Sequence, residues 1–416
     1  MEWKEVRLED VCEIKHGFAY KGKYFSDTPT CDILVTPGNF TLSGGFKLDK
    51  PKFYNGPVEK DYILSKGDLI VTMTDLSKNI DTLGYSALVP EVKGFTFHHN
   101  QRIGLVENIA NNVDKYFLYW IMRTSAYQSF IATHSSGTTV HHTSPKGIGN
   151  YVFKLPPLDD QRRIASILSS LDRKIELNNK INADLEEMAQ AIFKNWFVDF
   201  EPFKNGKFVD SELGMIPEGW KVVTLDDLTS KFGTGLNPRK NFVLGHGNNY
   251  YVTIKNMGNN RIYLNDRCDK VDDEALAKIN KRSKLQKGDL LFSGIGTIGR
   301  VAMVVDDPVN WNTSESVFNM HPIDTISSEF IYLLLLSDIF QQYVQQNAQG
   351  GVQQGIRMAS LKAFRLAIPD DLKAFDNLVK PIIAKVKNND KENDSLSLLR
   401  DTLLPRLMSG EIEVPE

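Results

Sequence analysis

Cysteine is scarce in this sequence, which has 3 cysteines that are far apart and never at the C-x-x-C spacing. Cys12, Cys31 and Cys268 therefore predict neither a disulfide framework nor a structural zinc site. Long apolar runs are also missing, since the longest, from Phe330 to Leu336, is far shorter than the roughly 20 residues of a membrane span. The opening residues, MEWKEVRLED, lack the apolar core of a signal peptide. We expect a cytoplasmic protein that does not enter a membrane.

Positive charge is not in excess either. The chain has 49 Lys and Arg against 52 Asp and Glu, a formal net charge of -3. A protein that coats nucleic acid on its own is strongly basic, so any nucleic-acid contact is expected to be local or shared with a partner. The hydrophobic content of 41% is ordinary for a globular protein, and 416 residues suffice for two or three domains.

What the sequence does contain is an internal repeat. The segment WKEVRLED at Trp3 returns as WKVVTLDD at Trp220, and KGDL at Lys66 returns at Lys287. Further matches at one constant offset are Phe117 with Phe330, Gly137 with Gly350, and Pro156 with Pro369. The chain therefore consists of one domain and one long segment, each present twice.

The stretch SGIGTIGR, from Ser293 to Arg300, matches the G-x-G-x-x-G fingerprint of dinucleotide-binding proteins, with Glu315 as the acidic residue further on. The fingerprint needs a helix after the glycines, whereas the residues that follow, VAMVV, are typical of a strand. The counterpart in the first copy, TMTDLSKNIDTLG from Thr72 to Gly84, retains only the last glycine. We therefore predict a variable loop between two paired strands.

Each copy ends in apolar residues spaced three and four apart, a heptad pattern with asparagines at its centre. The positions are Ile164, Leu168, Leu171, Ile175, Asn178, Asn182, Leu185, Ala189, Ile192 and Trp196, then Val379, Ile382, Val386, Asn389, Asn393, Leu396, Leu399, Leu403 and Leu407. Each predicts a helix of about 37 residues, roughly 55 Å long. An antiparallel pair brings the asparagines of the two helices together, where buried amides fix the register. A solvated polar centre is the alternative.

We predict an α+β protein with a pseudo-twofold internal repeat. Two similar mixed α/β domains at residues 1–155 and 220–368 are separated by two long helices, at 156–200 and 369–416, that form an antiparallel coiled coil. Residues 201–219, rich in Pro, Gly and charge, are the predicted linker. Two similar but unequal domains at a fixed separation suit two DNA half-sites, which in dimeric readers lie roughly 34 Å apart.

The central residues resemble a known family. LPPLDDQRRIA from Leu155, LDRKIELN from Leu171 and AIFKNWFVDF from Ala191 resemble the central region of the specificity subunit of Type I restriction-modification systems. DSELGMIPEGW from Asp210 resembles that family's entry to its second target-recognition domain, so the resemblance covers the full chain. The second copy departs from the family because PDDL at Pro369 lacks the Gln-Arg-Arg.

The resemblance implies a non-catalytic subunit that reads a bipartite, asymmetric site in double-stranded DNA. It implies docking of two modification (methyltransferase) subunits through the helices, with Gln161 and Arg162 joining the heptad positions in packing and docking, and restriction/translocase subunits beside them. S-adenosylmethionine, ATP and Mg²⁺ are then expected on the partner subunits. The chain itself has no G-x-x-x-x-G-K-[ST] loop for ATP, and LPPL is its nearest approach to the Asn-Pro-Pro-aromatic motif of amino-methyltransferases.

Two polar, glycine-bearing loops at the same place in the repeat are the candidate base readers, His134 to Lys146 and Gln346 to Arg357. Glutamine suits adenine and arginine suits guanine, so differences between the loops predict different half-sites. The residues singled out are Gly137, Thr138, Thr139, His141, His142 and Lys146, then Gly350, Gly351, Gln353, Gln354 and Arg357. Candidate phosphate contacts, which position DNA without specifying its sequence, are Lys78, Asn79, Arg239, Lys240, Lys255, Arg261 and Arg300. Solvated loops and surface charges without a ligand are the alternatives.

Two other classes of function compete with this interpretation. Asp81 with the Glu-x-Lys triplet at Glu91 loosely fits a magnesium-dependent nuclease, although the second copy offers no equivalent. A scaffold without a DNA role is the other. The pairs His98-His99 and His141-His142 do not predict a metal site, because adjacent histidines point in different directions and no carboxylate lies beside them at helical spacing.

Overall fold

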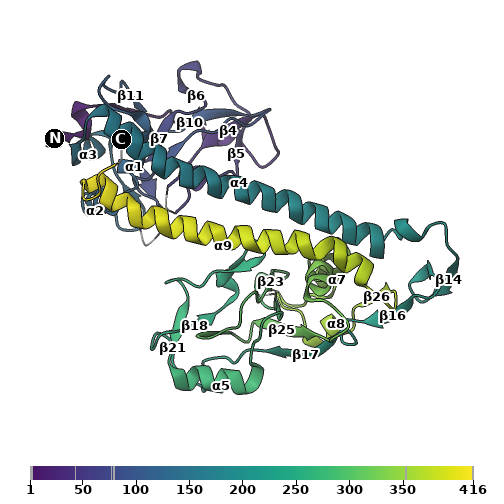
Figure 1. The fold of residues 1–416 in the computed structure, drawn as a ribbon. Coiled ribbons are helices and arrows are strands. Elements are labelled where there is room, and N and C mark those ends of the chain that lie inside the picture. Colours follow the sequence, from purple (N-terminus) through teal and green to yellow (C-terminus); the bar gives the residue numbers. More distant parts are fainter. Residues whose placement is uncertain (1–2, 43, 76, 78–79, 352–353, 415–416) are drawn as a thin grey trace. The chain divides into compact units, whose positions relative to one another are not determined.

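The computed structural model describes residues 3–42, 44–75, 77, 80–351 and 354–414. Lys78, Asn79 and Gln353, three of the predicted contact residues, lie outside these ranges. The chain divides into two compact units, unit 1 with residues 1–176 and 392–416 and unit 2 with residues 177–391 (Figure 1). Each unit therefore contains one globular domain and parts of both long helices.

Unit 1 is built on two larger sheets and a separate two-stranded ladder. The five-stranded sheet has the order β3 (Phe25–Ser26), β5 (Lys52–Tyr54), β4 (Asp32–Val35), β10 (Thr96–His99) and β6 (Ile63–Leu64). The four-stranded sheet has the order β2 (Glu13–His16), β11 (Ile103–Glu107), β7 (Leu69–Thr72) and β9 (Ser86–Leu88). The ladder pairs β1 (Lys4–Arg7) with β13 (Val152–Leu155), and a short pair joins β8 (Thr74–Asp75) to β12 (His141–His142).

The helices of the unit 1 domain close its core. They are α1 (Lys115–Ile121), α2 (Ser125–Thr133) and α3 (Pro145–Gly149). Asp114 caps α1 by accepting hydrogen bonds from the amides of Tyr116 and Phe117, and Thr124 caps α2. Phe117, Trp120 and Tyr127 are fully buried in one apolar cluster that also contains residues of both long helices. Burial of such aromatic side chains ties the long helices to the domain.

Unit 2 repeats this plan with different loops. One sheet has the order β17 (Thr229–Thr234), β25 (Val317–Pro322), β22 (Leu290–Ser293) and β23 (Val301–Met303), and the other has β21 (Asp269–Val271), β18 (Asn249–Val252) and β24 (Trp311–Thr313). The two-stranded pairs are β16 (Lys221–Thr224) with β26 (Arg365–Ile368) and β19 (Met257–Gly258) with β20 (Arg261–Ile262). The helices of the domain are α5 (Asp273–Ser283), α6 (Ser328–Leu336), α7 (Asp338–Asn347) and α8 (Met358–Lys362).

The structure confirms the predicted internal repeat, since equivalent strand pairs and turns occur in both units. The ladder of β1 with β13 has its counterpart in that of β16 with β26, and both are antiparallel. The KGDL turns are also equivalent: Gly67 and Gly288 have φ of +79° and +88°, and their amides donate to Val89 and Val304 at 2.8 Å each. The fold is thus α+β with two similar mixed domains, as the sequence predicts.

SGIGTIGR forms a loop between paired strands, as predicted, and no helix follows its last glycine. β22 and β23 on either side of it are antiparallel, with Leu290 opposite Met303. Two of the glycines are needed for the backbone, since Gly296 and Gly299 have φ of +84° and +94°. The fingerprint is therefore explained by turn geometry.

The two long helices are α4 (Leu158–Phe197), with 40 residues, and α9 (Lys373–Ser409), with 37. In unit 1, Asp172 of α4 bonds to Arg400 and Lys174 pairs with Glu392. In unit 2, Asn389 Nδ2 donates to Asn182 Oδ1 at 2.8 Å. Residues of higher number in α4 contact residues of lower number in α9, so the helix segments within each unit are antiparallel. Both asparagines are buried, which confirms the predicted amide pair and is contrary to a solvated centre.

The apolar stripe of the helices is wider than the heptad pattern predicts. Ile164, Leu168, Asn178, Val379 and Val386 are buried. Leu171, Ile175, Leu185, Ile192, Trp196, Ile382, Leu396 and Leu403 are half-buried. Leu399 is 47% exposed, so its assignment to the packed stripe was wrong.

Residues outside the heptad pattern fill much of the core instead. Phe193 and Phe197 of α4 pack with Phe375 of α9 at ring centroid distances of 6.1 and 4.8 Å. Leu404 and Met408 of α9 are buried in unit 1. Each helix packs on a globular domain as well as on its partner helix, and such a double contact requires a broader apolar face than a coiled-coil seam.

The predicted linker is more ordered than its composition suggests. Its residues form a short 3-10 turn, Glu201–Phe203, and a hairpin of β14 (Phe208–Ser211) with β15 (Gly214–Pro217). Gly214, with φ of +89°, makes the tight turn, and Ile216 is buried. A Pro- and Gly-rich segment with a few apolar side chains can thus form a hairpin.

Candidate nucleic-acid interface

In unit 1 the predicted reading loop is a hairpin with a fixed base. The amide of Ser136 donates to the carbonyl of His142 at 2.9 Å, and the amide of His142 donates back to Ser136 at 2.8 Å. Gly137 follows with φ of +99°, a conformation that other residues rarely adopt. The next amide, of Thr143, donates to the carbonyl of Met73 at 3.0 Å, so the hairpin lies against the loop that follows β7.

Unit 2 builds the same hairpin from different residues. The amides of Gln349 and Gly355 donate to each other's carbonyls at 2.8 Å, and Gly350 has φ of +116°. The amide of Ile356 donates to Gly294 at 2.9 Å, the counterpart of the bond from Thr143 to Met73. In both units the structure therefore brings the hairpin together with the loop that follows the central strand, which in unit 2 is SGIGTIGR.

The loop after β7 is organised by one buried carboxylate. Asp75 is 1% exposed and accepts hydrogen bonds from the amides of Ser77, Thr82 and Leu83 and from the Thr82 hydroxyl, at 2.6 to 3.0 Å. Burial by itself raises the pKa of Asp75, but these hydrogen bonds outweigh it and the pKa is lowered overall. The carboxylate is thus a charged anchor for the loop.

Most predicted contact residues are accessible. Those that are exposed are Gly137, Thr138, Thr139, His142, Lys146, Arg239, Lys240, Lys255, Gly350, Gly351, Gln354 and Arg357. His141 is half-buried, and His142 Nδ1 lies 3.1 Å from the Thr74 hydroxyl. The exposed side chains of the two hairpins differ in chemistry while their backbones are closed in the same way.

Two predicted phosphate contacts have partners within unit 2. Arg300 Nη1 donates to the carbonyls of Ile254 and Met257 at 2.7 and 2.6 Å, which joins SGIGTIGR to the turn that carries Lys255. Arg261 lies 3.6 Å from Asp390 and over the ring of Tyr263. Both guanidinium groups therefore support the local fold, a role that could not be read from the sequence because their partners are backbone carbonyls and a distant helix.

Three residues of the competing interpretations, His98, His99 and Glu91, have structural partners. His98 Nε2 lies 2.6 Å from Asp32 and His99 Nε2 lies 2.8 Å from the carbonyl of Ile103. Burial lowers the pKa of His99 to about 4. Glu91, the proposed nuclease carboxylate, is exposed and pairs with Lys66 at 2.7 Å. Within the described residues, no group of three or more His, Cys, Asp or Glu side chains is arranged to hold a metal ion.

Gln161 is a buried packing residue. Its side chain accepts from the amide of Asp114 at 2.8 Å and donates to the carbonyls of Asn112 and Pro156, which fixes the start of α4 to the start of α1. In unit 2 a different hydrogen bond takes the place of the Gln161 bonds. The hydroxyl of Ser327, the N-cap of α6, donates to Asp376 of α9 at 2.7 Å. The missing Gln-Arg-Arg of the second copy therefore does not leave that junction open.

Arg162, next to Gln161, faces outward. It lines a cavity of about 300 Å³ together with Tyr116 of α1 and Arg173 of α4, and its pair with Asp159 is long, at 3.5 Å. A guanidinium with so loose an internal partner is accessible to another molecule.

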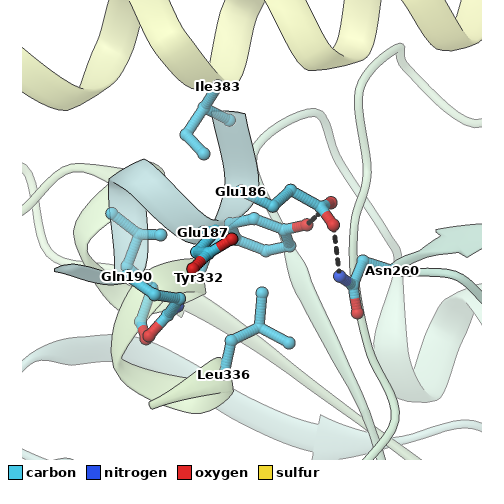
Figure 2. Close-up of a pocket in the computed structure, with 8 residues that line it drawn as sticks. Glu186, Glu187, Gln190, Asn260, Tyr332, Leu336 and Ile383 are labelled. Atoms are coloured by element: carbon cyan, nitrogen blue, oxygen red, sulfur yellow. Dashed lines mark hydrogen bonds between the residues drawn. The ribbon is translucent and has the colours of Figure 1, made fainter. Parts of the chain in front are cut away.

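A second cavity, of about 220 Å³, lies where α4, α6 and α9 meet in unit 2 (Figure 2). Glu186 points between two polar groups there, accepting from Asn260 Nδ2 at 3.2 Å and from the Tyr332 hydroxyl at 3.5 Å. Lys387 Nζ donates to the Asn260 carbonyl at 3.2 Å and lies 4.8 Å from the centre of the Tyr332 ring. Burial raises the pKa of Glu186 and lowers the pKa of Lys387, and each group partly offsets the other's shift.

The variant Glu186→Gln is expected to be more stable than the wild type at pH 7, with a Tm higher by on the order of 2 °C. The folded state holds the Glu186 proton more tightly than the unfolded state, so stability falls as pH rises from the ordinary pKa of 4.5 through the raised one. The amide removes this loss, and the two proteins should melt alike near about pH 4. The control is Glu187→Gln at the exposed neighbour. A lower Tm for Glu186→Gln at pH 7 would contradict the expectation.

Comparisons with known proteins agree on one family. The family model described as the Type I restriction modification DNA specificity domain matches residues 1–187 and again 217–398. The chain is 28% identical over 307 residues to the MjaIX specificity subunit of Methanocaldococcus jannaschii, covering 72% of this chain and 69% of the relative. It is 26% identical to the HindI specificity subunit of Haemophilus influenzae, covering 99% of this chain and all of the relative.

A solved structure has the same fold. The crystal structure of the Type I restriction-modification S subunit from M. genitalium aligns with a TM-score of 0.55 at 15% identity and covers 98% of this chain and 96% of that one. Among the described residues, no helix is long and apolar enough to span a membrane. Two matches of one domain model, in a chain that itself contains two copies of one domain, lead to a single assignment: the chain belongs to the family of Type I restriction modification DNA specificity domains, whose members are recognition rather than catalytic subunits.

Proposed function

We propose that this chain reads a bipartite, asymmetric site in double-stranded DNA, one half-site with each globular domain. The observation that carries the proposal is the pair of hairpins, which have the same backbone closure, at Ser136 with His142 and at Gln349 with Gly355, but different exposed side chains. A shared frame with different donors and acceptors gives two readers of different base sequence.

The roles of the residues follow from their chemistry. In unit 2, Gln354 offers the amide that pairs with adenine, and Arg357 offers the guanidinium that pairs with guanine. In unit 1, Thr138, Thr139 and His142 offer hydroxyl and imidazole groups in the same place. Lys146, Arg239, Lys240 and Lys255 contact phosphates, which adds affinity but no sequence preference.

The chain acts in the cytoplasm as part of a larger complex. Two modification subunits dock on the long helices, with Arg162 among the contacts, and restriction/translocase subunits join them. S-adenosylmethionine, ATP and Mg²⁺ belong to these partners, and the methyl group goes to an adenine N6 on each strand of the site. This chain supplies the choice of sequence.

The test is single-molecule sequencing of DNA from cells that express the cognate modification subunit with and without this chain. A two-part N6-methyladenine motif that is present only with the chain is the expected result. If no motif is found although the purified complex is intact, the proposal is overturned and the scaffold interpretation is favoured.

Exchange of one hairpin tip is expected to change one half of the motif. Replacing residues 137–141 by the five residues 350–354 keeps the hairpin length and the closing bonds of Ser136 and His142, so the domain should still fold. The unit 1 half of the methylated motif should change while the other half stays. A change in both halves, or in neither, would show that these hairpins do not read the half-sites.

A further inference from the structure

A third exposed segment lies beside the hairpin and the loop after β7 in unit 1. The turn Asn100, Gln101, Arg102 connects β10 to β11, and the carbonyl of Arg102 accepts from the amide of Met73 at 2.9 Å. Met73 is also the residue whose carbonyl receives the amide of Thr143 at the base of the hairpin. The three segments are therefore joined through one residue.

The backbone of this turn is rigid. Asn100 is 7% exposed, and its side-chain oxygen accepts from the amide of Arg102 at 3.1 Å. The amide of Gln101 donates to Phe18 at 2.9 Å, and a Cβ on Gly17 would stand 2.1 Å from the carbonyl oxygen of Asn100. So close a backbone approach fixes the turn from behind.

The two side chains at the tip are free. Gln101 and Arg102 are exposed, and neither side chain has a hydrogen bond or ion pair with any residue that the structure describes. They border a cavity of about 570 Å³ that is also lined by Phe25 and by Lys52, whose ammonium lies 4.9 Å from the centre of the Phe25 ring. Long polar side chains on a rigid base beside a basic and aromatic hollow suit contact with a nucleic acid.

Unit 2 repeats the turn with another chemistry. The carbonyl of Ser316 accepts from the amide of Gly294 at 2.9 Å, the counterpart of the bond from Met73 to Arg102. Glu315 then stands at the position of Gln101, half-exposed, and accepts from the Tyr251 hydroxyl at 3.2 Å. The frame is shared and the exposed residue differs, which is the same relation that the two hairpins show.

We infer that Gln101 and Arg102 determine sequence specificity in unit 1, and that Glu315 does so in unit 2. The inference rests on the proposed function and extends it to a segment outside the hairpins. Gln101 suits adenine and Arg102 suits guanine, each by two hydrogen bonds in the major groove, whereas Glu315 accepts a hydrogen bond from the amino group of cytosine.

The test uses the full complex, with motif sequencing for Gln101→Ala, Arg102→Ala and Glu315→Gln. Each unit 1 variant should relax one position in one half of the motif and lower methylation of the native site about 10- to 100-fold. Glu315→Gln should alter the other half only. The matched control is Lys93→Ala, which removes an exposed positive charge at the opposite end of β10 and should leave the motif unchanged.

The outcomes separate the inference from the proposed function. If the wild type directs a motif and the variants leave it and its rate unchanged, the inference fails and the proposed function stands. If Arg102→Ala lowers methylation uniformly and leaves the motif unchanged, Arg102 contacts a phosphate, and the inference that it reads a base is overturned. If the wild-type chain directs no motif, both fail. Melting curves of the variants test unfolding as the cause. Gln101 and Arg102 are exposed and their side chains make no bonds with the described residues, and the amide oxygen introduced by Glu315→Gln can still accept from the Tyr251 hydroxyl.

Discussion

Replacing Asp172 by alanine is expected to lower the free energy of unfolding by about 3 kcal/mol. Asp172 lies on α4 and accepts from Arg123 at 2.8 Å and from Arg400 of α9 at 2.7 Å. The two arginine side chains are 4% and 12% exposed, so removal of the carboxylate leaves two buried cations without their shared partner. Arg123 lies just after α1, so the Asp172 carboxylate joins the domain to both long helices of unit 1.

The matched control for this variant is Asp159→Ala on the same helix. Asp159 is 79% exposed and its pair with Arg162 is 3.5 Å long, so its loss should change stability by less than about 0.5 kcal/mol. Urea unfolding of both variants and the wild type gives the comparison. Equal stability of the two variants would mean that the Asp172 bridge is energetically neutral.

Replacing Gly137 by alanine is expected to reduce methylation of the recognised site at least about tenfold, with almost no effect on unfolding. Gly137 has φ of +99°, and a Cβ there would stand 2.0 Å from the carbonyl oxygen of Val140. Backbone strain of this kind costs about 1–3 kcal/mol, and about 1.4 kcal/mol corresponds to a factor of ten. The hairpin is exposed, so the cost appears as a distorted tip rather than as a less stable core.

Gly94→Ala is the control that separates the steric clash at Gly137 from the effect of a positive φ alone. Gly94 also has a positive φ, +87°, but no atom lies within 4 Å of a Cβ built there. It should cost some stability and leave methylation near the wild-type rate, measured on the same site. If Gly94→Ala reduces methylation as much as Gly137→Ala, the effect does not come from the hairpin tip.

Features that depend on local pattern were predictable from the sequence. The repeat in Trp3 and Trp220, the long helices and the strands around SGIGTIGR follow from residues that are close together in the chain. Even the pairing of Asn182 with Asn389 was accessible, because two polar interruptions at the centres of two apolar stripes have one antiparallel register that buries both. The hairpins at Gly137 and Gly350 were likewise located by the repeat, and their role as readers stays a prediction.

Features that depend on partners far away in the chain were not predictable from the sequence. Nothing near Arg300 in the sequence signals that its guanidinium binds the carbonyls of Ile254 and Met257, and the pattern around Asp172 does not distinguish it from the exposed Asp159. The exposure of Leu399 was missed for the same reason. The heptad counts only the partner helix, whereas the domains on which α4 and α9 also pack select a different stripe.

The repeat, the class of fold and the family could be predicted from the sequence alone, because periodicity and motif spacing are properties of consecutive residues. Which exposed side chains lie together depends on the tertiary structure. The turn at Gln101 and Arg102 carries no motif, and it stands with the hairpin only because Met73 bonds to both segments. Such a meeting is set by backbone hydrogen bonds across the sheet, and these depend on strand order and register rather than on the identity of the residues in the turn.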